Sequence, residues 1–174
     1  MNQISSEQKK SVRNWLVVPR VPLLAFTGLG FGILIFSLDQ ISKWLVLHYP
    51  FISQHTLPVT SFLNIILVWN RGISFGLLSN SSAHRLWFLA GVGCMMTAVL
   101  SLWVWKAETR TMAWGAGSVL GGAVGNLVDR FRFGAVTDFI DFHIYGYHWY
   151  TFNIADAAIL IGITLLIFEY YQET

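Results

Sequence analysis

Four apolar runs constrain the fold more than any other feature, because each approaches the roughly 20 residues that a membrane-spanning helix needs. The runs cover residues 22–38, 86–105, 112–128 and 154–171. Only 11% of the 174 residues are charged, whereas soluble domains carry about a quarter. We therefore expect an all-α membrane protein with four transmembrane helices.

The chain has neither internal repeats nor an obvious linker, so residues 1–174 are predicted to form a single integral membrane domain. Residues 1–20 form a polar tail with several basic residues, and no small-residue cleavage site follows the first apolar run. The basic tail and the basic turn at 106–110 are expected in the cytoplasm. Both termini would then be cytoplasmic, and residues 39–85 and 129–153 would lie outside.

Charge and cysteine content exclude some functions. A net charge of +2, spread along the chain, does not predict nucleic-acid binding. The single cysteine, Cys94, excludes an intrachain disulfide, and its apolar surroundings predict a small buried side chain.

The first outer segment is expected to contain short strands. Residues 57–69 are rich in Val, Ile, Thr, Phe and Trp, which is typical of strands, and a turn is predicted at Asn70–Gly72, before residues 73–78. The small polar residues 79–83 predict a mobile segment before the second span. We expect a small extracytoplasmic β-sheet on the membrane surface.

Small residues recur at intervals of four in the third run, at Ala113, Gly117, Gly121 and Gly125. Small residues at this spacing allow another helix to approach closely. This stripe predicts a tight helix–helix contact, which would hold the polar end of the third helix rigidly.

Acids and amides gather next to the third and fourth runs. Asn126 shares one helix face with Asp129 and with Arg130, because they follow it by three and four residues. Asp156 falls in the first turn of the fourth helix, which favours an anion, and Asn153 is a good N-cap. Helix capping alone would explain this second group.

Asp138 and Asp141 belong to a short segment, 136–142, that is predicted to be extended. Residues three apart in an extended chain face opposite sides of the backbone. Only one of the two is therefore expected to face a partner acid, and composition does not decide which.

Two carboxylates held close together share one proton, so one can activate water while the other polarises a carbonyl group. This chemistry is aspartic peptide hydrolysis, which needs neither metal nor cofactor, and we expect neither.

A serine–lysine dyad at Ser42 and Lys43 is disfavoured, because neighbours on a helix do not face each other. His143 and His148 could bind a metal with Asp138 and Asp141, but no His-Glu-x-x-His motif is present. Asp39 and Lys43 predict an ion pair at a helix end.

Five segments together resemble the lipoprotein signal peptidases (signal peptidase II), a bacterial family of membrane aspartic peptidases. They occur in the family's order and span most of the chain: Leu38-Asp-Gln-Ile-Ser-Lys43, Trp69-Asn-Arg-Gly-Ile-Ser-Phe-Gly76, Gly121-Gly-Ala-Val-Gly-Asn-Leu-Val-Asp-Arg130, Val136-Thr-Asp-Phe-Ile140 and Phe152-Asn-Ile-Ala-Asp156.

This resemblance implies a role for each site residue. It makes Asp138 and Asp156 the catalytic pair and leaves Asp141 outside the motif core. It assigns Asn70 and Arg130 to the substrate backbone, and Asn126 and Asn153 to the lining of the site. Supporting positions would be Asp39, Lys43, Gly72 and Asp129.

The resemblance also implies the substrate and the location. The substrates would be prolipoproteins carrying diacylglycerol on a cysteine, cut just before that cysteine. The enzyme would be a monomer in the bacterial inner membrane, in contact with membrane lipids, with its active site at the outer face, and peptide antibiotics such as globomycin would bind there. The competing hypothesis is a small transporter or proton relay, which would distribute carboxylates through the bilayer depth, whereas here Glu169 is the only acid within the apolar runs that lies near the other side.

Overall fold

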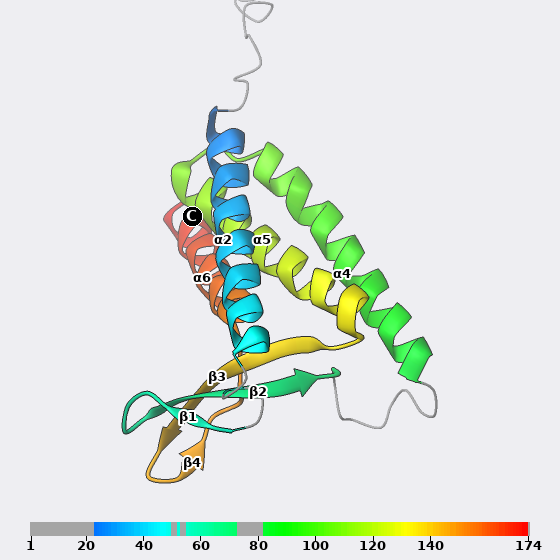
Figure 1. Cartoon of the computed structure of the whole chain (residues 1–174). Helices are drawn as coiled ribbons and strands as arrows, with labels where there is room; N and C mark the ends of the chain where they lie inside the picture. Colours follow the sequence, from blue (N-terminus) through cyan, green and yellow to red (C-terminus); the bar gives the residue numbers. More distant parts are fainter. Residues whose placement is uncertain (1–22, 50–51, 53–54, 73–81, 174) are drawn as a thin grey trace, which may run out of the picture.

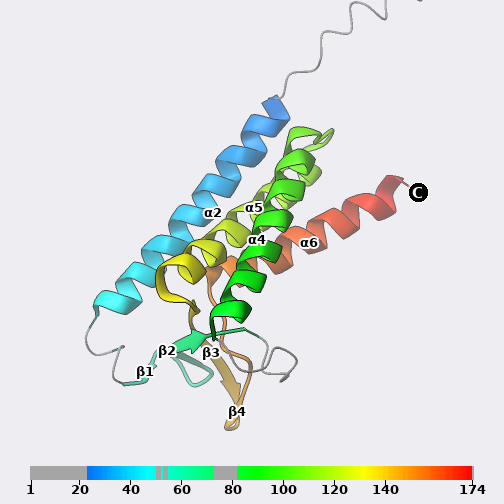
Figure 2. The ribbon, with the colours of Figure 1, turned by 90° about the vertical axis from the view of Figure 1, so that its right-hand side faces the viewer.

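Four long helices form a bundle in the computed structural model, which describes residues 23–49, 52, 55–72 and 82–173. The helices are α2 (Leu23–His48), α4 (Ser82–Trp105), α5 (Arg110–Phe133) and α6 (Ile154–Glu173). The sheet lies across one end of the bundle, while the start of α2, the α4–α5 turn and the end of α6 lie at the other end (Figures 1 and 2).

The sheet is antiparallel, with strands in the order β1 (Leu57–Pro58), β2 (Leu63–Asn70), β3 (Val136–Ile144) and β4 (Tyr147–His148). The expected strands within residues 57–69 are therefore confirmed. The predicted segment 73–78 lies outside the described residues, as do residues 79–81. Ser82 and Ala83, which were expected in a mobile segment, instead form the first turn of α4.

Helix α5 is the centre of the bundle, because it contacts α2, α4 and α6. Among the described residues, three segments are long and apolar enough to cross a membrane: α2, residues 87–105 of α4 and residues 154–172 of α6. Helix α5 is not one of these three. Because it lies at the centre of the bundle, it carries small residues where the other helices carry large apolar side chains that face lipid. Three apolar helices and a small sheet agree with the expected membrane fold, but α5, which was expected to be a fourth spanning helix, is not among the helices that meet this criterion.

Glycines allow α5 to pack backbone-to-backbone against α2. A Cβ at Gly117 would collide with the carbonyl oxygen of Gly28, and one at Gly121 with that of Gly32. The predicted close contact is confirmed. Gly125, at the end of the same stripe, leaves room for the carboxylate of Asp39.

The outer faces of the helices are strongly apolar. Exposed side chains include Phe26, Ile33, Met95, Leu102 and Ile167. Burying these side chains in lipid is the arrangement expected of a membrane protein. Cys94, which was expected to be buried in the protein, is exposed on this surface. Its apolar neighbours therefore reflect contact with lipid and not a protein core.

Each helix differs slightly from its predicted span. The largest difference is in α2, which continues past Leu38 to His48. Asp39 and Lys43 therefore form their ion pair, 2.8 Å long, within the helix and fully buried, and not at a helix end. The prediction of their position was wrong because polar residues normally end an apolar span, whereas here α5 and α6 supply partners for them.

Candidate active site

The connection from α5 to β3 brings two polar segments together. Helix α5 ends at a C-cap, Gly134, whose φ of 70° suits glycine and whose N–H donates to the Arg130 carbonyl oxygen. The Asp129 carboxylate then accepts a 2.9 Å hydrogen bond from the Thr137 N–H. This bond fixes the beginning of β3, and so the position of Asp138, against the end of α5.

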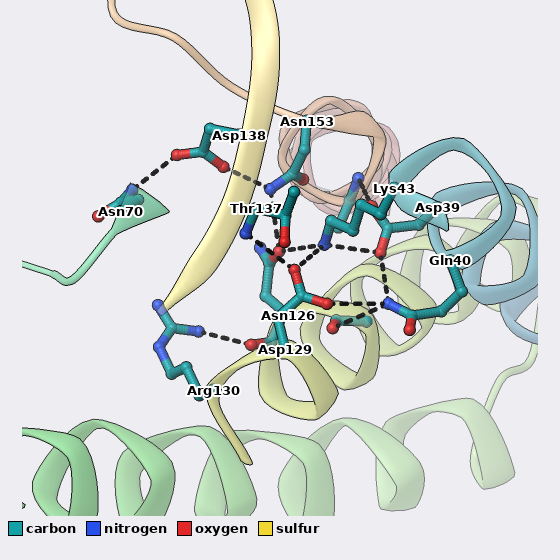
Figure 3. A network of polar contacts seen from close by, with 12 residues as sticks. Asp39, Gln40, Lys43, Asn70, Asn126, Asp129, Arg130, Thr137, Asp138 and Asn153 are labelled. Atoms are coloured by element: carbon teal, nitrogen blue, oxygen red, sulfur yellow. Dashed lines mark hydrogen bonds and ion pairs between the residues drawn. The ribbon is translucent and has the colours of Figure 1, made fainter. Parts of the chain in front are cut away.

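Asp138 is buried, with an exposed fraction of only 1%. Its two oxygens accept hydrogen bonds from two amides, Asn70 Nδ2 at 2.9 Å and Asn153 Nδ2 at 2.6 Å (Figure 3). These donors come from the end of β2 and from the start of α6. The carboxylate is thus held from two sides by elements far apart in the sequence.

Asp156 is fixed at the beginning of α6 by a reciprocal cap. Its N–H donates to Asn153 Oδ1 at 2.9 Å, and its carboxylate accepts from the Asn153 N–H at 3.2 Å. The expected capping role of Asn153 is therefore confirmed. Because the same side chain also donates to Asp138, capping and site formation coincide.

Asn126 joins the two acids. Its Nδ2 donates to Asp156 at 2.7 Å, and its Oδ1 accepts from Asn153 Nδ2 at 3.1 Å. The same Oδ1 accepts from Lys43 Nζ at 3.0 Å, which fixes the orientation of the amide. Two amides, Asn126 and Asn153, therefore bracket Asp138 and Asp156.

A buried network of ion pairs holds these amides in place. Lys43 Nζ lies 2.8 Å from Asp39 and 3.0 Å from Asp129, and all three side chains are at most 2% exposed. Asp39 also accepts from the Ala155 N–H at 3.0 Å, which ties α2 to the start of α6. A buried charge is tolerated only when it is paired and hydrogen-bonded, as it is here.

The environment of Asp138 favours its protonated form. Burial raises the pKa of its carboxyl group from 3.8 to about 6, against the hydrogen bond from Asn70, and the negative charge of Asp156 acts in the same direction as burial. Asp138 and Asp156 are therefore close enough for their charges to interact. Such a pair retains one proton at a higher pH than isolated carboxyl groups.

Asn70 and Arg130 lie at the edge of this cluster. Asn70 Oδ1 accepts from the Gly72 N–H at 2.9 Å, so its Nδ2 is turned toward Asp138. Gly72 has a φ of 86°, a conformation that favours glycine. Arg130 donates to the Asn126 carbonyl oxygen at 3.1 Å, and its positive charge acts on Asp156 and Asp138.

A cavity of about 550 Å³ opens beside Asp138. One wall is the end of β2 with its turn, residues 68–72, and the other is the segment 148–151. The cavity therefore gives a ligand access to Asp138 and Asn70 from the sheet side.

Asp141 belongs to a different group of side chains. It accepts hydrogen bonds from Asn64 Nδ2 and His148 Nδ1, both at 2.9 Å. Within the described part of the chain, no three His, Cys, Asp or Glu side chains are arranged to hold a metal ion. The structure therefore gives no support to a metal site at His143 and His148.

Sequence reasoning missed several polar contacts. Gln40 donates to Asp129 at 3.3 Å, Thr137 reaches Asp129 through its backbone, and Asn64 binds Asp141. Gln40 carries a usable signal, since it is a polar residue next to Asp39 in an apolar run. The contacts of Thr137 and Asn64 depend on strand register and have no local signal.

Comparisons with known proteins show a family similarity over most of the chain. Residues 31–172 match the family described as signal peptidase (SPase) II. A lipoprotein signal peptidase from Ralstonia nicotianae is 38% identical over 143 residues, which is 81% of this chain and 82% of the relative. One from Cupriavidus necator is 36% identical over 167 residues, 95% of this chain and 93% of the relative.

Solved structures give the same result for the fold. A bacterial membrane enzyme solved by the in meso method at 1.9 Å resolution superposes with a TM-score of 0.76 and 27% sequence identity. The match covers 88% of this chain and 97% of that structure. Together with the family match over most of the chain, these likenesses show that the chain belongs to the signal peptidase II family.

Proposed function

We propose that this membrane protein is an aspartic endopeptidase that removes signal peptides from prolipoproteins, with Asp138 and Asp156 as its catalytic pair. The main support is the arrangement of these two carboxylates. They come from β3 and α6, are bracketed by Asn126 and Asn153, and Asp138 lines an open cavity.

In the proposed reaction the pair holds one proton. The ionised carboxylate accepts a proton from water as the water oxygen attacks the scissile carbonyl carbon, and the protonated carboxyl group donates to the carbonyl oxygen. Collapse of the resulting tetrahedral diol breaks the C–N bond, and a carboxyl group protonates the leaving amine. Burial of Asp138, which raises the pKa of its carboxyl group to about 6, favours this proton-sharing state.

The surrounding residues are proposed to hold the substrate and the pair. Asn70 and Arg130 contact the substrate backbone, while Asn126 and Asn153 line the site and orient the acids. Gly72 turns Asn70 toward Asp138. Asp39, Lys43 and Asp129 are supporting residues, because their ion network fixes Asn126 and the start of α6.

We further propose the placement of the enzyme in the bacterial inner membrane. All four helices cross the bilayer, and α5 is shielded from lipid by the other three. Both termini are cytoplasmic, and the sheet end with the site is at the outer face. There a monomer, surrounded by membrane lipids, cuts just before the diacylglyceryl cysteine. Globomycin-like peptides would compete for the cavity beside Asp138.

The transporter or proton-relay hypothesis has less support. The relatives are named as peptidases, and the site acids gather where α5 ends, β3 begins and α6 begins, and not along the length of the bundle.

Cleavage of a diacylated prolipoprotein by the purified protein tests the proposal. We expect Asp138→Asn and Asp156→Asn each to lower the rate by at least about a hundredfold while remaining folded, because each removes a proton-transfer group. Glu169→Gln, at the other end of α6, should cleave normally, and EDTA should have no effect on the parent. Full cleavage by either Asn variant would refute the assignment of Asp138 and Asp156 as the catalytic pair.

A further inference from the structure

A second pair of titratable side chains, Asp141 and His148, lies on the sheet side of the proposed site. His148 lines the same cavity as Asp138 and Asn70, from the opposite wall. The Asp141 carboxylate is buried while the His148 side chain is 54% exposed, and its Nδ1 lies 2.9 Å from both Asp141 oxygens. The cavity wall therefore carries an imidazole that is held in position by a buried carboxylate.

The contacts of Asp141 fix its charge and the orientation of the imidazole. Burial raises the pKa of Asp141, but hydrogen bonds from Asn64 and His148 outweigh burial and hold this pKa below its ordinary value. A carboxylate only accepts hydrogen bonds, so Nδ1 of His148 must donate. In the neutral imidazole Nε2 is then an acceptor.

A stacking contact on its face also holds the His148 ring. The His143 ring stacks on it, with centroids 5.1 Å apart and an interplanar angle of 29°. The titratable and charged groups around the imidazole are thus Asp141 and His143 on its own hairpin, with Arg71 and Asp138 among the other residues that line the cavity. A side chain fixed this firmly and yet half exposed is suited to bind a ligand.

We propose that His148 is a substrate-binding residue whose neutral imidazole accepts, through Nε2, a hydrogen bond from a peptide N–H of the bound prolipoprotein, and that Asp141 is the positioning residue that selects this tautomer. This inference rests on the proposed peptidase function. It assigns a role to the wall formed by residues 148–151, whereas Asn70 belongs to the first wall and Asp138 lies beside the cavity.

The test is steady-state cleavage of a diacylated prolipoprotein, with kcat and KM measured separately. We expect His148→Phe to raise KM about fivefold, the size of one neutral hydrogen bond, with kcat within about twofold. His148→Gln keeps a terminal acceptor and should restore part of the affinity. Asp141→Asn should raise KM as His148→Phe does, because an amide can donate to Nδ1 and so turn Nε2 into a donor.

A double-variant cycle separates this role from a structural one. In Asp141→Asn/His148→Phe the buried charge has gone, so the variant avoids the carboxylate that keeps only Asn64 as a partner in His148→Phe alone. We expect its KM to equal that of His148→Phe, since both residues act through one nitrogen. His48→Gln, an equivalent change at the exposed end of α2, is the control and should match the parent.

Two outcomes would overturn the inference. One is an unchanged KM in folded His148→Phe and double variants. The other is a KM for the double variant that is the product of both single effects. In either case, continued cleavage by the parent and its loss in Asp138→Asn would leave the proposed peptidase function intact.

Discussion

At the scale of single residues, the proposed reaction depends on the proton that Asp138 shares with Asp156. Burial raises the pKa of this carboxyl group to about 6, and the proposed reaction needs the pair to carry one proton. As the pH rises through this pKa the proton is lost, so kcat/KM should fall about tenfold per pH unit above about pH 6. The pH profile of prolipoprotein cleavage measures this limb, whose apparent pKa belongs to the pair.

A variant of Asn70 tests whether Asp138 is the group that gives this pH profile. Its 2.9 Å hydrogen bond stabilises the ionised form of Asp138 and lowers the pKa of that group. Asn70→Ala should therefore move the falling limb to higher pH, whatever it does to the maximal rate. A limb that stays in place, or moves to lower pH, would show that Asp138 is not the group that titrates.

The residues of the site differ in how far the sequence could predict them. The spacing of Asp138 and Asp141 predicted that only one would face the site, and the structure indeed places them among different partners. Local spacing could not say which, because the answer depends on how β3 aligns with β2, where Asn70 and Asn64 lie. Only the family resemblance selected Asp138.

At the scale of elements, the contact between α2 and α5 determines the position of the ion network. The close approach at Gly121 and Gly32 brings Lys43 of α2 to Asp129 of α5. In Gly121→Ala the new Cβ would overlap the Gly32 carbonyl oxygen and separate the helices. We expect a loss of about 1–3 kcal/mol in the free energy of unfolding, as for other overpacked interiors.

Gly30→Ala is the matched control for this contact. Gly30 also lies in a helix, but a Cβ there meets no atom within 4 Å. Alanine is the better helix former by about 0.5–1 kcal/mol, so this variant should be at least as stable as the parent. Unfolding by SDS titration in mixed micelles compares the two variants, and equal stabilities would mean that the α2–α5 contact tolerates an extra methyl group.

The sequence predicted these elements unevenly. The stripe of small residues in α5 predicted a close contact because packing of this kind has a local signature. The length of α2 was not predictable, because Asp39, Gln40 and Lys43 resemble the end of an apolar span. They continue the helix since the partners that neutralise them come from α5 and α6, far along the sequence.

At the scale of the whole molecule, the two ends of the bundle have different chemistry. The sheet end carries the acids and amides of the site, while the other end carries the α4–α5 turn with Lys106 and Arg110. Lys and Arg near helix ends favour the cytoplasmic side. The site would then face outward, where a prolipoprotein presents its lipidated cysteine after translocation.

Cysteine labelling tests this orientation, because the chain has one cysteine. In a Cys94→Ser background, a cysteine placed at Tyr145, which is 98% exposed on the β3–β4 hairpin, should react with a membrane-impermeant maleimide in intact spheroplasts. A cysteine placed at Glu108, in the α4–α5 turn, should react only after the membrane is permeabilised. The reverse pattern would put the site in the cytoplasm, which would contradict both the proposed orientation and the proposed cleavage at the outer face.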